Sequence, residues 1–442
     1  MSDSEPHDIL ANLAYTILHV GVPSDENGPN PSSDMRTLRV FPVLLALAAV
    51  ALAACATDAS PEADALPGRN GPIAIENVTV VPLDEERTVP GQTVVIQDGR
   101  IAEIGAADAV EVPEGAVRVD GSGKYLMPGL AEMHAHLPGE DEAAYRDDIL
   151  FLFVANGVTF ARGMQGAPDH PALRDAIAEG ERFGPTLRVS SPFMSGEIET
   201  PDAARALVRE YHEAGYDLLK VGEGIQPEVY NAIADEARSL DMPFAGHVPD
   251  AVGLLRALEA GQRTVDHLDN YLEAMRADEA PDEYPAIFGV EALVPHLETD
   301  RMAELVTATE RAGTGMVPTM VVWHTFFDDV PIDRYRDERP EVRYLPGDVV
   351  EGWENGLTNM RRSGDAQRKQ EVIALRQELL RALDEADVPI LLGSDAPQIF
   401  NVPGFSVHRE MQYMQNEGGR APYDVRVSGT RAIAEFYGEE DV

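Results

Sequence analysis

The stretch YLMPGLAEMHAHL, residues 125–137, decides which fold and chemistry this chain is expected to have. It predicts a short apolar strand that starts at the turn of Pro128 and Gly129 and ends on His134 and His136. Because side chains alternate between the two faces of a strand, both histidines project to the same side, roughly 7 Å apart at ~3.4 Å per residue. Such a pair can hold a metal ion, but alone it is weak evidence, since histidine is also common at surfaces. The residues at the ends of later strands therefore decide the interpretation.

The composition limits the classes of protein to which this chain can belong. The 442 residues suffice for one large domain and a smaller one, and 44% of them are hydrophobic, which is typical of a globular chain. The formal net charge is −42, which repels phosphate backbones and argues against nucleic-acid binding. Nearly all positive charge is arginine, because Lys124, Lys220 and Lys369 are the only lysines.

The sole cysteine, Cys55, lies at the end of an apparent export signal. Arg36 and Arg39 precede the apolar run 40–54, which ends in Leu-Ala-Ala before the cysteine. Positive, apolar and small residues in this order predict a secretory signal peptide. The ending is similar to a bacterial lipobox, which implies that Cys55 is lipidated and anchors an exported protein in the cell envelope, facing the periplasm. An uncleaved membrane helix is the alternative, but the run is short for a hydrocarbon core of ~30 Å.

This signal sets the first segment boundaries. A signal peptide acts at an N-terminus, so Met35 is the expected start, and residues 1–34 form an upstream extension whose composition predicts no fold. We expect five segments: the extension 1–34, the signal peptide 35–55, a linker 56–72, a small β-sandwich module 73–127 and a barrel 128–442.

The module is predicted from short β segments. They cover residues 73–82, 93–97, 100–104 and 117–120, and Asp98-Gly99 between two of them predicts a hairpin turn.

After Gly129, apolar strands alternate with helical runs, which predicts βα units around a parallel sheet. Eight strand candidates cover residues 129–136, 157–161, 186–190, 217–221, 243–247, 264–267, 315–322 and 389–395. Helices are expected at 203–213, 227–239, 252–259, 368–386 and 425–437, with a loop-rich insertion at 271–345. Eight such units predict an α/β fold of the (β/α)8 TIM-barrel class. Dinucleotide and P-loop motifs are missing from the sequence.

Most of these strands end on residues that can bind a metal. In such barrels the active site forms at the carboxyl ends of the strands. The residues at these ends are His134, His136, Lys220, His247, His267 and Asp395. A lysine there is costly unless it is neutral or paired, and a neutral amine can react with CO2 to give a carbamate that bridges two metals. The alternative is an ion pair of Lys220 with Asp217 or Glu223.

The motifs PGLAEMHAHL, DLLKV, FAGHV, TVDHL and LLGSDA carry these residues. With them the chain resembles the amidohydrolase superfamily, in the group of imidazolonepropionase-like and prolidase-like metal-dependent hydrolases. The resemblance implies two divalent ions, expected to be zinc, one on His134 and His136 and one on His247 and His267. It also implies that Lys220, carboxylated by CO2, bridges both ions, and that Asp395 binds the more buried ion and transfers a proton.

The implied activity is hydrolysis of an amide or peptide-type C–N bond in a small substrate, a dipeptide or an N-acyl amino acid. Two alternatives stay open: hydrolysis of a cyclic amidine, lactam or lactone, and a surface lipoprotein that binds a ligand without turnover. The only membrane contact expected is the lipid anchor, and homo-oligomerisation also stays open.

The chain departs from the family pattern at two places. Gly163 stands where relatives often have an aspartate, and the chain stops at Val442, where relatives continue into strands that complete the sandwich. Among the remaining side chains, His324 and Trp323, just past the seventh strand, are candidates for substrate contact. Surface positions are expected for the other histidines of this region, which are His170, His212, His296 and His408.

Overall fold

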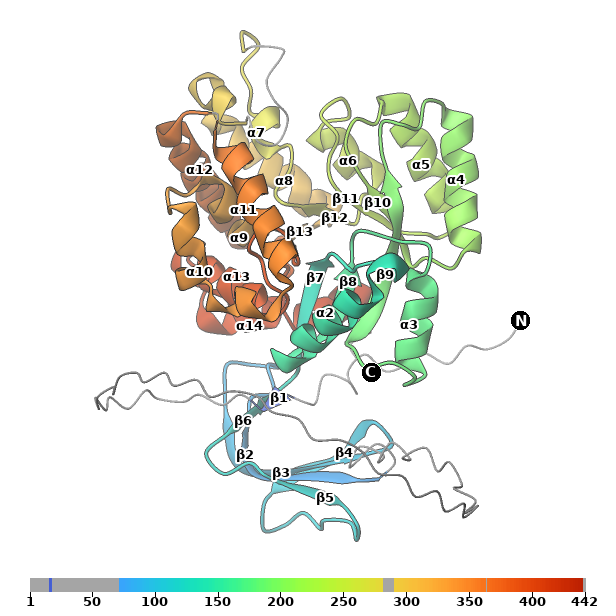
Figure 1. The fold of residues 1–442 in the computed structure, drawn as a ribbon, viewed down its shortest axis with the longest axis vertical. Helices are drawn as coiled ribbons and strands as arrows, with labels where there is room; N and C mark the ends of the chain where they lie inside the picture. The colour runs from blue at the N-terminus through green and yellow to red at the C-terminus, as the bar shows by residue number, and fades with distance from the viewer. Residues whose placement is uncertain (1–15, 18–70, 281–289, 363, 440–442) are drawn as a thin grey trace, which may run out of the picture.

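The computed structural model describes residues 16–17, 71–280, 290–362 and 364–439. Its centre is a sheet of seven parallel strands in sequence order, which helices surround (Figure 1). The strands are β7 (Leu130–Ala135), β8 (Val158–Gly163), β9 (Thr186–Met194), β10 (Leu218–Val221), β11 (Phe244–Gly246), β12 (Thr264–Asp266) and β13 (Gly315–Val317). Parallel order with helical crossovers is the architecture predicted from the alternating pattern, so the barrel class is confirmed.

An eighth segment, residues 389–396, closes the ring between β13 and β7. Leu391 N donates to Met316 O of β13 at 2.8 Å, and Met133 N of β7 donates to Leu392 O at 2.9 Å. The segment pairs on both sides at the predicted place, but it forms isolated bridges rather than a regular strand. The reason is the buried Glu132 carboxylate, because its Oε1 accepts the N–H groups of both His134, at 2.9 Å, and Ser394, at 2.8 Å.

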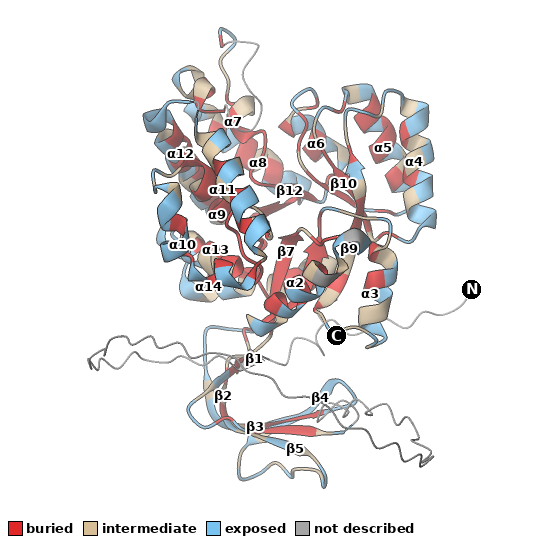
Figure 2. Cartoon of the chain, in the orientation of Figure 1, coloured by how far each residue is buried: buried red, intermediate tan, exposed pale blue. Residues whose placement is uncertain are grey.

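The outer helices bury one face each against the barrel. They include α2 (Ala143–Ala155), α3 (His170–Ala178), α4 (Pro201–Glu213), α5 (Pro227–Ser239), α6 (Leu254–Ala260), α8 (Met302–Ala312) and α12 (Ala366–Glu385). The predicted bounds of α5 are confirmed residue for residue. Helix α4 begins two residues earlier than predicted, because Thr200 caps it by accepting from Ala203 N and Pro201 fits its first turn. In Figure 2 the barrel strands are buried and the outward faces of these helices are exposed.

The seventh strand was predicted too long. It ends at Val317, and residues 320–327, predicted in part as strand, form the helix α9 (Met320–Phe327). The apolar, β-branched sequence around Val321 favours a strand by its local propensity. This segment forms a helix instead because of the contacts that the helix makes with the rest of the protein.

The prediction of a loop-rich insertion at 271–345 is also largely wrong. Besides α8, β13 and α9, it contains α7 (Tyr271–Ala274), η2 (Val290–His296), η3 (Thr299–Arg301), η4 (Ile332–Arg334), α10 (Tyr335–Glu338) and η5 (Pro340–Tyr344). Four further helices follow: α11 (Gly347–Arg361), α13 (Phe405–Asn416), α14 (Pro422–Ser428) and α15 (Arg431–Tyr437). The last two stand in place of the one helix predicted at 425–437.

A separate six-stranded sheet lies below the barrel in Figure 1. It consists of β1 (Thr16–Ile17), β2 (Ile73–Val80), β3 (Val89–Gln97), β4 (Arg100–Ala106), β5 (Val117–Asp120) and β6 (Tyr125–Met127). The β3–β4 hairpin turns at Asp98 and Gly99, whose φ values of 53° and 76° confirm the predicted tight turn. The opening stretch of sequence thus spans β6 of this sheet and β7 of the barrel.

The predicted signal peptide 35–55 with Cys55 lies outside the described residues. Among the helices that the structure describes, none combines the length and the apolar character needed to cross a membrane.

Candidate metal centre

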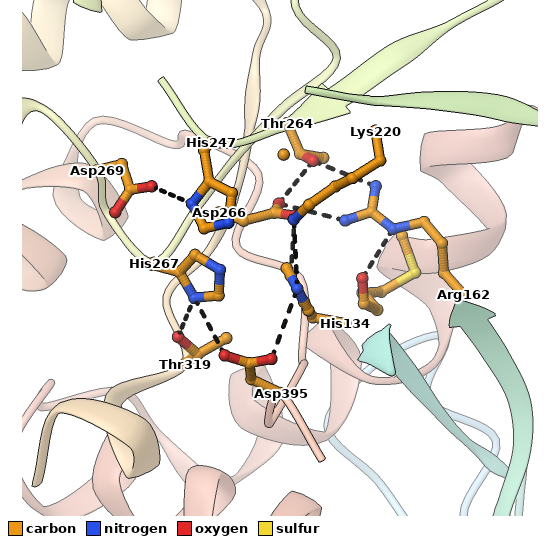
Figure 3. A network of polar contacts seen from close by, with 12 residues as sticks. His134, Arg162, Lys220, His247, Thr264, Asp266, His267, Asp269, Thr319 and Asp395 are labelled. Atoms are coloured by element: carbon orange, nitrogen blue, oxygen red, sulfur yellow. Dashed lines mark hydrogen bonds and ion pairs between the residues drawn. The ribbon is translucent and has the colours of Figure 1, made fainter. Parts of the chain in front are cut away.

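The structure brings all six predicted ligand residues to one mouth of the barrel. His134 lies on β7 and His136 directly after it, and Lys220 lies on β10. His247 and His267 follow the last residues of β11 and β12, and Asp395 comes from the closing segment. Figure 3 shows five of them, all but His136, pointing toward one another.

Short distances connect these side chains. Asp395 Oδ1 lies 2.9 Å from His136 Nε2 and 3.6 Å from His134 Nε2. The Lys220 amine is 3.4 Å from the same His134 nitrogen. The ring of His267 is 4.5 Å from that of His134, centre to centre. The rings of His134 and His136 are 5.5 Å apart, which agrees with the common side expected from strand alternation.

Burial favours the neutral form of three of the histidines and of the lysine at this site. It lowers the pKa of His134 and of His267 well below the usual 6.5, and lowers the pKa of His247 to about 4. Burial also lowers the pKa of Lys220, although the carboxylates of Asp266 and Asp395 oppose this shift. Neutral imidazoles are the form that binds metal, and a neutral amine is the form that reacts with CO2.

The donor set fits a divalent ion. Ligand atoms of His134, His267 and Asp395 all lie within 4.8 Å of one another. Within the described part of the chain, Asp395 Oδ1 is buried and has no hydrogen-bond donor of suitable geometry. A buried carboxylate oxygen without such a donor is costly, and a cation at this position would satisfy it.

A second group of side chains also offers ligand atoms close to one another, and its two acidic members were not predicted as ligands. Glu223, His247 and Asp269 also offer ligand atoms within 4.8 Å of one another. Asp269 Oδ2 is 2.7 Å from His247 Nδ1, and Glu223 Oε1 is 3.7 Å from it. Both acids follow a predicted ligand by two or three residues, so the motifs TVDHLDN and LLKVGE carried a signal that could have identified them.

Partners behind the ligands hold the remaining ring nitrogens. Asp266 Oδ2 lies 2.9 Å from His134 Nδ1 without the geometry of a hydrogen bond. The other oxygen of Asp266 accepts from Arg162 at 3.2 Å and from Thr264 at 2.7 Å. His267 Nδ1 lies 2.8 Å from Thr319 Oγ1. Such contacts fix the orientation of a ligand ring. The sequence reasoning named none of these partners.

The alternative for Lys220, an ion pair with Asp217 or Glu223, does not agree with the structure. The two oxygens of Asp217 accept from Arg174, at 3.0 Å, and from Val189 N, at 2.7 Å. Glu223 lies near His247, whereas the Lys220 amine faces His134.

His324 and Trp323 contact neighbouring parts of the protein, and their contact with a substrate stays a prediction. Trp323 is buried and its Nε1 donates to His267 O at 3.1 Å. His324 Nε2 lies 2.6 Å from Glu417 Oε2, and the His324 ring stacks on Tyr413 at 4.1 Å. Because α9 replaces the end of the predicted strand, both residues lie on a helix and not in a segment directly past a strand.

The surface position expected for His170 is also wrong. Its side chain is buried, with Nδ1 accepting from Ala167 N at 3.2 Å and Nε2 lying 3.3 Å from Pro138 O. His212 is exposed as expected, while His296 and His408 are half-buried.

Comparison with solved structures shows where this architecture recurs. The bottromycin amidohydrolase matches 84% of this chain and 79% of its own with a TM-score of 0.64 at 22% identity. A Xaa-Pro dipeptidase with bound methionine matches 84% of this chain and 90% of its own with a TM-score of 0.60 at 17% identity. The chain has the amidohydrolase fold.

Sequence comparison gives shorter matches. The imidazolonepropionase of Anaeromyxobacter dehalogenans is 27% identical over 210 residues, which is 43% of this chain and 48% of that protein. The chain spans less than half the length of the curated relatives that it matches. No model of a known protein family matches the chain.

Proposed function

We propose that this chain is a metal-dependent hydrolase that cleaves an amide or peptide-type C–N bond in a small substrate. The observation that carries the proposal is the convergence, at one mouth of the barrel, of six side chains from five strand ends: His134, His136, Lys220, His247, His267 and Asp395. Structural side chains seldom gather in this way, whereas the carboxyl ends of barrel strands are where such enzymes place their ligands.

Two ions, proposed to be zinc, divide these ligands between them. His134, His136 and Asp395 would hold the more buried ion, since Nε2 of both histidines lies within 3.6 Å of Asp395 Oδ1. His247 and His267, whose rings stack at 4.9 Å, would hold the second. Lys220, as a carbamate, would reach both. Nitrogen and carboxylate donors in this number are the set that zinc prefers.

Such ions, when bound, lower the pKa of a water molecule and polarise the scissile carbonyl. The protein supplies the proton transfer. Asp395 Oδ1 faces the histidines and has no donor of its own among the described residues, so it can accept the proton of the attacking water and return it to the leaving nitrogen. Asp266 and Thr319 keep His134 and His267 turned toward the site meanwhile.

A linear substrate is our first proposal, because a Xaa-Pro dipeptidase shares its fold with 84% of this chain. A cyclic amidine, lactam or lactone is the second, because a relative that matches over 210 residues is an imidazolonepropionase.

The test is a screen of dipeptides, N-acyl amino acids and cyclic amides with the wild type and with Asp395→Asn. We expect turnover of one class by the wild type and a kcat at least ~100-fold lower for the variant, as for loss of a general base. A wild type without metal and without turnover on any class would contradict the proposal and favour a non-catalytic binding protein.

A further inference from the structure

Thr319 occupies the position that precedes helix α9, yet its side chain does not cap the helix. A threonine at this position ordinarily accepts a hydrogen bond from a backbone N–H of the first turn. Here no such bond forms, and Oγ1 lies 2.8 Å from Nδ1 of His267 instead. The backbone of Thr319 has φ of 45°, a left-handed conformation that is unusual for a β-branched residue. Some other contact must therefore hold this turn in place.

The contact comes from Glu410 on α13, distant in sequence. Its carboxylate is fully buried, and its two oxygens accept from Met320 N at 2.9 Å and from Val321 N at 2.7 Å. These are N–H groups of the first turn of α9, which have no partner within the helix itself. Glu410 therefore does the capping that the side chain of Thr319 leaves undone.

We propose that Glu410 is a positioning residue for His267. By capping α9 from another helix, it leaves the Thr319 hydroxyl free to hold Nδ1 of His267, so that Nε2 of this ring is the nitrogen left for a metal. The inference rests on the proposed function, because it treats His267 as a ligand.

A second contact between α9 and His267 supports this positioning role of Glu410. Trp323, also on α9, donates from Nε1 to His267 O at 3.1 Å, and Arg376 donates to the same oxygen. The Arg376 guanidinium covers the Trp323 ring at 3.4 Å. His267 itself has φ of 62°, so its backbone needs such restraint. A shift at the start of α9 would therefore disturb both the ring and the backbone of His267.

The test uses Thr319→Val, which keeps the shape but removes the hydroxyl, Thr319→Ser, which restores it, and Glu410→Ala. Zinc affinity is measured by competition with a chelator, and the absorption spectrum of the Co²⁺-substituted protein reports the ligand geometry. We expect Thr319→Val and Glu410→Ala each to weaken binding of one ion by 10- to 100-fold and to change the spectrum, and Thr319→Ser to behave as the wild type. The double variant should lose little more than either single variant, since both act through one contact.

The matched control is Thr200→Val, because Thr200 caps α4 in the ordinary way by accepting from Ala203 N. It should lower thermal stability and leave zinc affinity unchanged. If Glu410→Ala does not fold, Glu410→Gln, which keeps one acceptor, replaces it. A wild type that binds two ions, with Thr319→Val and the Glu410 variant binding equally well, overturns this inference alone. A wild type that binds none overturns the proposed function and the inference with it.

Discussion

Gly246 lies directly against the side chain of Lys220. A methyl group added at residue 246 would be 2.8 Å from Lys220 Cδ and 2.7 Å from Val221 O, closer than such atoms approach in proteins. We predict that Gly246→Ala displaces the Lys220 amine and weakens metal binding at least ~10-fold, the size of effect seen when support for a ligand is lost. Metal content after dialysis against a chelator is the measurement.

The control for this variant is Gly261→Ala. Gly246 has φ of +119° and Gly261 has +84°, but a methyl group at residue 261 would meet no atom within 4 Å. Both alanines carry the strain of a positive φ, which costs about 1 kcal/mol or more, and only the first touches Lys220. Equal metal loss in the two variants would show that the contact with Lys220 is not the cause.

Arg162 is expected to stabilise the barrel interior through its pair with Asp266. The two side chains are almost fully buried, 3.2 Å apart, and Arg162 Nε also donates to Met133 O at 2.7 Å. Arg162→Met leaves a buried carboxylate without its countercharge, so we predict a loss of ~3–5 kcal/mol in the free energy of unfolding, measured with urea. Arg87→Met, which breaks an exposed pair with Asp84, should change the stability far less, because solvent screens this pair. Similar losses for both variants would contradict the role of the buried pair.

Stability should depend on pH through Glu410. Burial raises the pKa of this carboxyl from 4.5 to about 8. The hydrogen bonds from Val321 N and Met320 N lower this pKa, and the carboxylates of Glu132 and Glu417 raise it further. Between these pH values the unfolded chain binds fewer protons than the folded one, so Glu410 contributes less stability as pH rises from about 5 to about 8. We predict that the stability of the wild type relative to Glu410→Gln falls by on the order of 4 kcal/mol over this interval. Urea unfolding at both pH values measures it, and a constant difference would rule the prediction out.

Lipidation at Cys55 is the proposed link to the membrane. Cys55→Ser removes the only thiol that can be acylated. We predict that the variant moves from the membrane fraction to the soluble fraction, followed by immunoblot of fractionated cells. Retention of the variant in the membrane fraction would contradict the lipid anchor.

The sequence predicted the convergence of the candidate ligands because the evidence for each of them is local. Each candidate ligand ends a short apolar segment, and parallel strands in a barrel bring all their carboxyl ends to one rim. His134, Lys220 and Asp395 are more than 80 residues apart in the chain, yet the strand pattern alone predicted that they meet.

The parts that could not be predicted depend on distant contacts. The run around Val321 favours a strand by its local sequence, and it forms a helix whose first N–H groups bind Glu410 of another helix. The role of Arg162 was likewise not predicted, because its partner Asp266 lies on β12, four strands further along the barrel sheet from β8.

The most direct test of the central claim is the number of metal ions per chain. The protein is purified without chelator, and metal is counted by elemental analysis in the wild type and in Lys220→Ala. We predict two divalent ions in the wild type and one or none in the variant. No metal in the wild type would contradict the metal centre, and two ions in both proteins would contradict the bridging role of Lys220.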